Sequence, residues 1–391
     1  MKNTAIYLDY NATTPLDPAV LDTMLPFLGE AFGNPSSSSH SFGWQASAAV
    51  EKARRQVANT LNAQPQEIYW TSGATESNNL AILGSALAHL KQSTQQAPHI
   101  LTASSEHKAV LEVCEQAQSL GAELSILPVN RYGQVEPDEI RRNIRPNTKL
   151  ISVMFANNEI GSINPIREIG QICKEFGIWF HTDAAQAAGK VPIDVDALGV
   201  DLLSISGHKI YGPKGVGVLY VRNQNPKVEL HPLFFGGSQE KGLRPGTLNV
   251  PGIVGLGQAL ELASELMESE ELRLRDYAQC LIQTIHSEAP EVILNGHPTE
   301  RLAGNISLSF PDLRSDIFSM GLSGLALSSS SACTSENATP SHVLKAIGHS
   351  DVLARSTLRI GLGRPTQKED VDFAAQKLLG LVRKNKDLSI P

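Results

Sequence analysis

The chain of 391 residues is too long for one ordinary hydrophobic core, and its length favours two domains or one large α/β domain with an appendage. Its composition, 41% hydrophobic and 19% charged, is typical of a globular protein, and no apolar run is long enough to span a bilayer. The formal net charge of −7 argues against nucleic acid or an anionic membrane surface as the main partner.

The N-terminal stretch and the cysteines indicate the compartment. The sequence MKNTAIYLDYNATTPL lacks the basic and apolar regions of a secretory signal, so we expect a cytoplasmic protein. The four cysteines lie far apart without a CxxC spacing, which disfavours both a zinc site and a disulfide framework. We therefore expect reduced thiols and no bound metal.

The first two thirds of the chain alternate helical and strand patterns. Helical periodicity is clear over 44–63, 74–90 and 167–176. Strand-like runs occupy 67–73, 99–104, 123–129, 149–156, 177–184, 201–207 and 215–221. This alternation predicts an α/β fold with a mixed, mostly parallel sheet covered by helices on both faces. The last run follows its predecessor after a short turn, so we expect it to be antiparallel.

The pattern changes from about Val254. A long helix is predicted over 254–285, followed by strand-like runs at 291–296 and 305–310 and a final helix over 368–384. These elements predict a smaller α+β domain. We place the large domain at residues 17–258 and assign residues 1–16 and 259–391 to the small one.

Polar residues follow several strands of the predicted large domain, at the sheet edge where α/β proteins bind ligands. Thr75 stands in a strand-to-helix turn that suits an anion, although an ordinary helix cap explains it equally. Asp183 ends an apolar strand and needs a partner there. Lys209 ends the next strand, as either a solvated lysine or a tuned nucleophile. An amine, a buried carboxylate and a phosphate cup together describe a site for pyridoxal phosphate.

Ten motifs in order resemble the cysteine desulfurases, a branch of the fold-type-I pyridoxal phosphate enzymes related to the class V aminotransferases. The match covers nearly the whole chain. The motifs are YLDYNATTPLDP, FGNPSSSSHSFGWQA, TSGATESNNLAI, SSEHKAVL, NNEIG, HTDAAQ, SGHKIYGPKGVGVLYVR, LRPGT, SSSSACTS and TLRIGLGR. The resemblance implies a fold-type-I enzyme that uses pyridoxal phosphate to convert L-cysteine to L-alanine.

The same resemblance assigns roles to individual positions. Lys209 matches the lysine that forms the Schiff base, and Asp183 matches the partner of the pyridine nitrogen. His107 matches the histidine that stacks on the ring and handles protons. Arg359 matches the arginine that binds the substrate carboxylate, a task suited to its bidentate fork. The other implied contacts are Asn158 and Gln186 near the phenolic oxygen, Asn34 and Asn158 near the substrate, and Ala74, Thr75, Ser206 and His208 around the phosphate.

Two further implications concern partners. Thr247 matches a residue that reaches the phosphate of the neighbouring subunit, which implies a homodimer. Cys333 lies in a stretch of small and polar residues without periodicity, which predicts a mobile, exposed loop. It matches the cysteine that takes the substrate sulfur as a persulfide in group I enzymes and delivers it to an acceptor protein. The acceptor would be an iron–sulfur scaffold or a tRNA-thiolation relay.

Three alternatives stay open at this point. An aminotransferase for a small amino acid would use Lys209, Asp183 and Arg359 but would have no need of Cys333. A selenocysteine lyase would differ only in its substrate. A catalytically silent adaptor of a sulfur-transfer complex would bind no cofactor and would be colourless.

Overall fold

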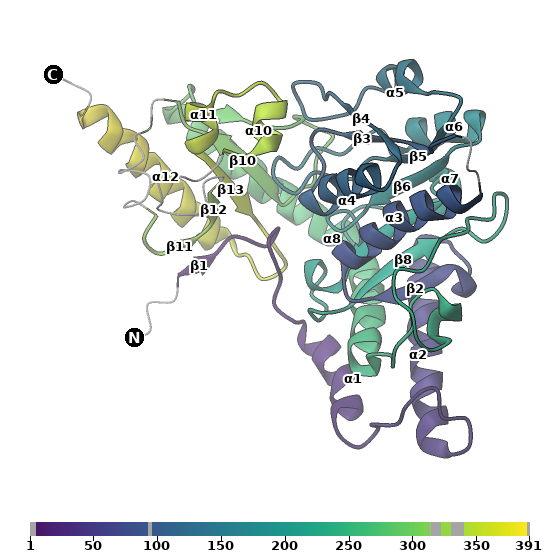
Figure 1. The fold of residues 1–391 in the computed structure, drawn as a ribbon. Coiled ribbons are helices and arrows are strands. Elements are labelled where there is room, and N and C mark those ends of the chain that lie inside the picture. The colour runs from purple at the N-terminus through teal and green to yellow at the C-terminus, as the bar shows by residue number, and fades with distance from the viewer. Residues whose placement is uncertain (1–4, 93–95, 312, 314–321, 330–339, 389–391) are drawn as a thin grey trace.

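The computed structural model describes residues 5–92, 96–311, 313, 322–329 and 340–388. Within these residues, two main sheets lie in separate lobes, and a pair of helices, α1 (Pro18–Leu28) and α2 (Ser41–Leu61), projects from the larger lobe (Figure 1). None of the described helices is long and apolar enough to cross a membrane.

The larger lobe contains a seven-stranded sheet in the order β2-β8-β7-β6-β5-β3-β4. Its strands are β2 (Ile68–Thr71), β3 (His99–Ala103), β4 (Glu123–Leu127), β5 (Thr148–Ser152), β6 (Trp179–Asp183), β7 (Leu202–Ser206) and β8 (Gly217–Val221). Only β8 runs antiparallel to its two neighbours, and all other pairs from β7 to β4 are parallel. The predicted mixed sheet and its antiparallel strand are therefore confirmed.

Both faces of this sheet are buried, because adjacent residues of each strand lie in different cores. One core takes Leu101, Ile151, Leu203 and Val218 from neighbouring strands. The other core takes the adjacent residues Ile100, Leu150, Leu202 and Leu219. Helices α3 (Ala74–Gln92) and α4 (Lys108–Ser119) cover the second face. Helices α2, α5 (Pro137–Asn143), α6 (Ile166–Phe176) and α8 (Val250–Glu288) cover the first.

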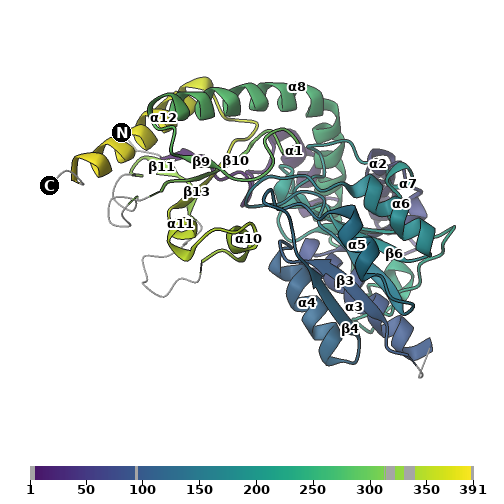
Figure 2. The same cartoon turned by 90° about the horizontal axis from the view of Figure 1, so that it is seen from above.

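Helix α8 links the two lobes (Figure 2). Its 39 residues begin against the large sheet through Leu256 and Leu260, and they end in the core of the smaller lobe through Leu281 and Ile285. The predicted domain boundary at residue 258 falls inside this continuous helix. The division into domains therefore stays a prediction.

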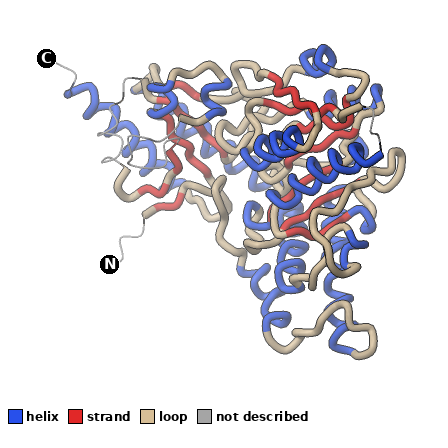
Figure 3. Tube along the Cα trace, viewed as in Figure 1, coloured by secondary structure: helices blue, strands red, loops and turns tan. Residues whose placement is uncertain are grey.

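The smaller lobe is built on a four-stranded antiparallel sheet in the order β12-β13-β10-β9 (Figure 3). Its strands are β9 (Ile293–Leu294), β10 (Asn305–Ser309), β12 (Ser328–Ser329) and β13 (Thr357–Gly361), with α10 (His342–Ala346), α11 (Asp351–Arg355) and α12 (Lys368–Leu388) beside them. The N-terminal strand β1 (Ile6–Tyr7) pairs with β11 (Leu325–Ala326) in the same lobe. The chain then crosses to the large sheet, where the Thr14 N–H donates to the His208 carbonyl at 2.9 Å.

Candidate active site

One cavity brings together most of the residues that the sequence singles out. It has a volume of about 640 Å³, within the range of roughly 300–1,000 Å³ that is usual for small-molecule sites. It opens beyond the carboxyl ends of β6 and β7 and receives residues from both lobes. Ten predicted site residues line it: Ala74, Thr75, His107, Asn158, Asp183, Gln186, Ser206, His208, Lys209 and Arg359.

Lys209 stands immediately after β7, in the short helix η2 (Gly207–Lys209). Its Nζ donates to the backbone carbonyls of Asn11 at 2.7 Å and Ala12 at 2.6 Å. Burial, followed by the nearby Arg359 cation, lowers the pKa of Lys209 to about 8. About a tenth of these side chains therefore carry a neutral, nucleophilic amine at pH 7.

Asp183 is the last residue of β6 and is 6% exposed. Its Oδ2 accepts a hydrogen bond from Asn78 Nδ2 at 2.7 Å, and its Oδ1 accepts one from the Ala185 N–H at 2.9 Å. These donors give the buried carboxylate the partners that it needs. Asn78 belongs to α3, so helix and strand together hold the carboxylate at the cavity wall.

The turn before α3 also lines the cavity, together with Ser206 and His208. The first backbone N–H groups of a helix have no intrahelical acceptor, and α3 starts at Ala74, so this end suits an anion. Gly217 on β8 lets the turn approach, since a Cβ there would lie 2.6 Å from the Gly73 Cα. Burial, followed by the charges of Lys209 and Lys214, lowers the pKa of His208 to about 4, which leaves its ring neutral.

His107 caps the N-terminus of α4, and its Nδ1 accepts from the Ala109 N–H at 3.1 Å. A neutral imidazole has one N–H, so this contact places the proton on Nε2. The side chain lines the cavity and is otherwise exposed. Its ring is therefore available both to a planar ligand and to proton transfer.

Arg359 comes from β13 of the smaller lobe and reaches the same cavity. Its Nη1 donates to the Asn158 carbonyl at 3.0 Å, and its Nη2 donates to Asp9 Oδ1 and Ser328 Oγ, both at 2.9 Å. Asp9 and Arg359 form an ion pair whose side chains are 18% and 15% exposed. These contacts hold a guanidinium at the wall of the cavity, where it can bind a carboxylate.

Two predicted site residues lie outside this cavity, and the structure does not describe a third. Thr247 and Asn34 are exposed and do not line the cavity of their own chain. Cys333 falls in 330–339, outside the described residues. Of the described residues on either side of it, Ser328 Oγ accepts from the cavity-lining Arg359, and the His342 ring contacts the carbonyl of Glu106, the residue before His107, at 2.8 Å.

The pattern of strands and motifs does not reveal every residue that shapes the site. Asn78 holds Asp183, Asn11 holds Lys209, and Asp9 holds Arg359. All three lie inside motifs that the resemblance rests on, YLDYNATTPLDP and TSGATESNN. The motifs therefore contain these residues, but the residues bind other residues rather than a ligand, so no chemical pattern marks them.

The residues present fit pyridoxal phosphate. A helix N-terminus for the phosphate, a paired carboxylate for the ring nitrogen and an amine of lowered pKa all face one cavity of adequate volume. The structure brings these groups together, whereas their individual roles stay predictions.

Comparison with known proteins agrees with this arrangement. The family described as Aminotransferase class-V matches residues 6–373. A cysteine desulfurase of Mus musculus is 48% identical over 384 residues, which cover 98% of this chain and 83% of that protein. The solved structure of a NifS-like protein has a TM-score of 0.88 at 35% identity and covers 97% of this chain and 100% of its own. A structure titled SspA in complex with cysteine has a TM-score of 0.79 at 41% identity, with coverages of 91% and 98%.

Proposed function

The chain belongs to the class-V aminotransferase family, whose members use pyridoxal phosphate, and we propose that it is a cysteine desulfurase. It would convert L-cysteine to L-alanine and retain the sulfur on Cys333. The observation that carries this proposal is the convergence of Lys209, Asp183 and Arg359 on one cavity. The nearly full-length similarity to a cysteine desulfurase supports the choice of substrate.

The chain's own groups divide the work of binding and proton transfer. Bound pyridoxal phosphate supplies an electron sink for negative charge at the substrate Cα. Lys209 attaches the cofactor through its amine and, when that amine is free, removes the Cα proton. Asp183 holds a proton on the ring nitrogen, and the N-terminus of α3 binds the phosphate. Arg359 orients the substrate through its carboxylate.

Sulfur transfer is assigned to Cys333 and His107. The Cys333 thiolate attacks the sulfur of the substrate, forming an S–S bond while the Cβ–S bond breaks. The electron pair of that bond remains on carbon, which is protonated to give alanine, so no external oxidant is needed. His107 lines the cavity with Nε2 free to exchange a proton, which supports its role as the proton donor and acceptor in this step.

The proposal includes a homodimer, supported by an exposed apolar surface at the α1–α2 projection. Its large side chains are Leu25, Leu28, Phe32, Phe42 and Trp44, each at least 50% exposed. Asn34, a predicted substrate contact, lies in the connection between these helices. Arg244 Nε donates to the cavity-lining Glu76 at 2.9 Å, which places the 244–247 stretch near the phosphate end. A second copy that covers this surface would explain why Asn34 and Thr247 lie outside their own chain's cavity.

We also propose that sulfur passes from Cys333 to an acceptor protein in the cytoplasm, either an iron–sulfur scaffold or a tRNA-thiolation relay. The support is the family resemblance, together with the described cysteines Cys114, Cys173 and Cys280, all of which are free thiols. Capture of the proteins that receive labelled sulfur, followed by mass spectrometry of Cys333, identifies the acceptor.

The decisive experiment combines the purified protein with pyridoxal phosphate and L-cysteine. We expect a yellow protein that forms alanine, with a persulfide on Cys333 detected by mass spectrometry. Cys333→Ala is expected to keep the cofactor and to lose the persulfide; unchanged formation of alanine and sulfide would refute that role. Amino-group exchange with an α-keto acid would instead indicate an aminotransferase. A preference for selenocysteine would indicate a selenocysteine lyase, and a colourless protein would indicate an adaptor.

A further inference from the structure

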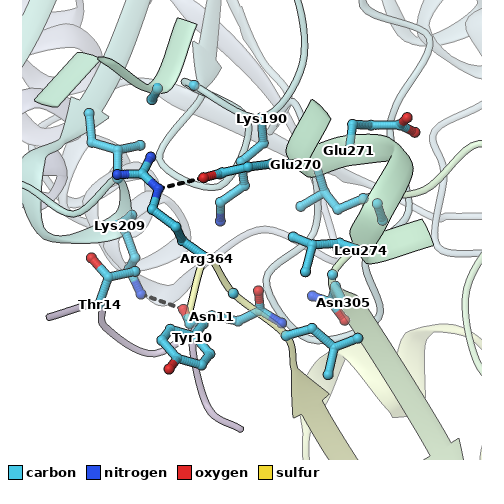
Figure 4. A pocket seen from close by; sticks show the side chains of 18 of the residues that line it. Tyr10, Asn11, Thr14, Lys190, Lys209, Glu270, Glu271, Leu274, Asn305 and Arg364 are labelled. Carbon is cyan, nitrogen blue, oxygen red and sulfur yellow. Dashed lines mark hydrogen bonds and ion pairs between the residues drawn. The ribbon is translucent and has the colours of Figure 1, made fainter. Parts of the chain in front are cut away.

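A second cavity, with a volume of about 50 Å³, shares Lys209 and Asn11 with the main cavity (Figure 4). Lys190 points into it, and Glu270, Arg364 and Tyr10 lie around it. Nothing in the proposed chemistry uses Lys190. Placing a lysine amine in such a cavity costs folding free energy, so its presence there calls for a specific role.

The contacts of Lys190 lead to the main cavity. Its Nζ donates to Gln186 Oε1 at 3.2 Å, and Gln186 Nε2 donates to the Asn11 carbonyl at 2.8 Å. The same Asn11 carbonyl accepts from Lys209 Nζ at 2.7 Å. Lys190 and Lys209 are thus the two ends of one short chain of hydrogen bonds.

This chain decides which way the Gln186 amide faces. An amide can turn its oxygen or its nitrogen toward a neighbour, whereas the protonated lysine ammonium only donates. Lys190 therefore requires Oε1 on its own side, and the carbonyl of Asn11 requires Nε2 on the other. An NH2 group has two N–H bonds, so one remains for an acceptor in the main cavity, which Gln186 lines.

The charged groups around Lys190 change the pKa of its amine. Lys209 and Arg359 repel the Lys190 amine, and burial together with these cations lowers the pKa of Lys190 to about 7. Glu270 attracts it, although that carboxylate is also paired with Arg364. Glu271 lines the same cavity. A second amine beside a catalytic one disfavours the charged form of both.

We propose that Lys190 is a positioning residue, which orients the Gln186 amide so that its remaining N–H faces the cofactor site. This inference rests on the proposed function, and it extends it by assigning a task to a residue behind the reacting groups. The N–H of Gln186 would then stabilise negative charge on the phenolic oxygen of pyridoxal phosphate, and the positive field of Lys190 would add to that effect.

The test measures cofactor binding in the absence of L-cysteine. In Lys190→Met, which is nearly as long but cannot donate, the Gln186 amide loses one of the two contacts that fix its orientation and keeps only the one to the Asn11 carbonyl. We expect the dissociation constant for pyridoxal phosphate to rise about five- to tenfold, as for the loss of one well-placed hydrogen bond. The pH midpoint of the bound cofactor's visible absorption should rise by about half a unit or more, since a donor and a positive charge are both removed.

Control variants separate orientation from folding. Lys190→Arg retains a donor and a charge and should restore the midpoint, while Lys227→Met, at an exposed position, should change nothing. In a Gln186→Leu background, Lys190→Met should cause little further loss of affinity for pyridoxal phosphate, because that loss acts through the Gln186 amide, whereas the part of the midpoint shift due to the lost charge should remain. If Lys190→Met does not fold, Lys190→Gln, which keeps an N–H donor, should retain the affinity within about twofold.

The outcomes distinguish this inference from the proposed function. Three results would each overturn the positioning role. They are an unchanged absorption midpoint in folded Lys190→Met, losses of cofactor affinity that add up when Lys190→Met and Gln186→Leu are combined, and a tenfold loss of affinity in Lys190→Gln. A protein that binds pyridoxal phosphate but does not desulfurate cysteine would overturn the proposed function alone. A protein that binds no pyridoxal phosphate would overturn both.

Discussion

The two lobes contribute to the active site in different ways. The large sheet supplies Asp183 as the last residue of β6 and Lys209 from the short helix that follows β7, so their backbone positions follow from the packing of two cores. The smaller lobe supplies Arg359 from an antiparallel strand, and that side chain is held by Asp9 of the N-terminal arm. The two residues of the large lobe suit cofactor chemistry, and the arginine of the smaller lobe suits recognition of the substrate. Mutations in the two lobes should therefore affect different kinetic constants.

The largest effect is expected from Lys209→Ala. Without its amine the protein cannot attach the cofactor or remove the Cα proton, so kcat for alanine formation should fall by about a thousandfold or more. Lys214→Ala, at another lysine that lines the cavity, is the matched control and should keep most of the activity. Substantial turnover in Lys209→Ala would contradict the assignment of the large-lobe residues to chemistry.

A smaller loss is expected from Asp183→Asn. The amide keeps the shape of the side chain but cannot hold a proton on the ring nitrogen, so kcat should fall by about a hundredfold while KM changes little. Steady-state kinetics at saturating pyridoxal phosphate measure both constants. The exposed variant Asp22→Asn is the control, and a change confined to KM would show that Asp183 belongs to substrate binding instead.

Arg359→Lys tests the role of the smaller lobe in binding the substrate. Lysine keeps the charge but loses the planar fork, so KM for L-cysteine should rise about ten- to thirtyfold with a smaller change in kcat. Arg355→Lys on the surface of α11 serves as the control. If kcat fell as far as in Asp183→Asn, the division of labour between the lobes would be wrong.

The pH dependence of cofactor attachment should give the smallest effect. Only the neutral amine attacks, and the pKa of Lys209 is lowered to about 8, so the rate of covalent attachment to cofactor-free protein should rise about tenfold from pH 7 to 9 and then level off. A lysine of ordinary pKa would give a rise of about a hundredfold over the same range without a plateau. Stopped-flow absorbance at several pH values distinguishes the two profiles.

Much of the fold follows from local patterns in the sequence. Strands β3 to β8 and helices α2, α3, α6, α8 and α12 lie where periodicity predicts them, because apolar spacing reports which residues face a core. Short elements such as α7 (Val195–Leu198) and α11 contain too few residues for a period to appear. The order of the strands is also absent from local patterns, since pairing joins segments that lie far apart in the chain.

The sequence by itself, through motifs that resemble those of the cysteine desulfurases, predicted which residues would carry the chemistry. Only the tertiary structure decided what holds them. Asp9, Asn11 and Lys190 act through contacts between distant segments, such as the 198 residues that separate Asn11 from Lys209. Such contacts depend on how the N-terminal arm crosses between the lobes, and hydrogen bonds to backbone carbonyls leave no pattern in the side chains of a sequence.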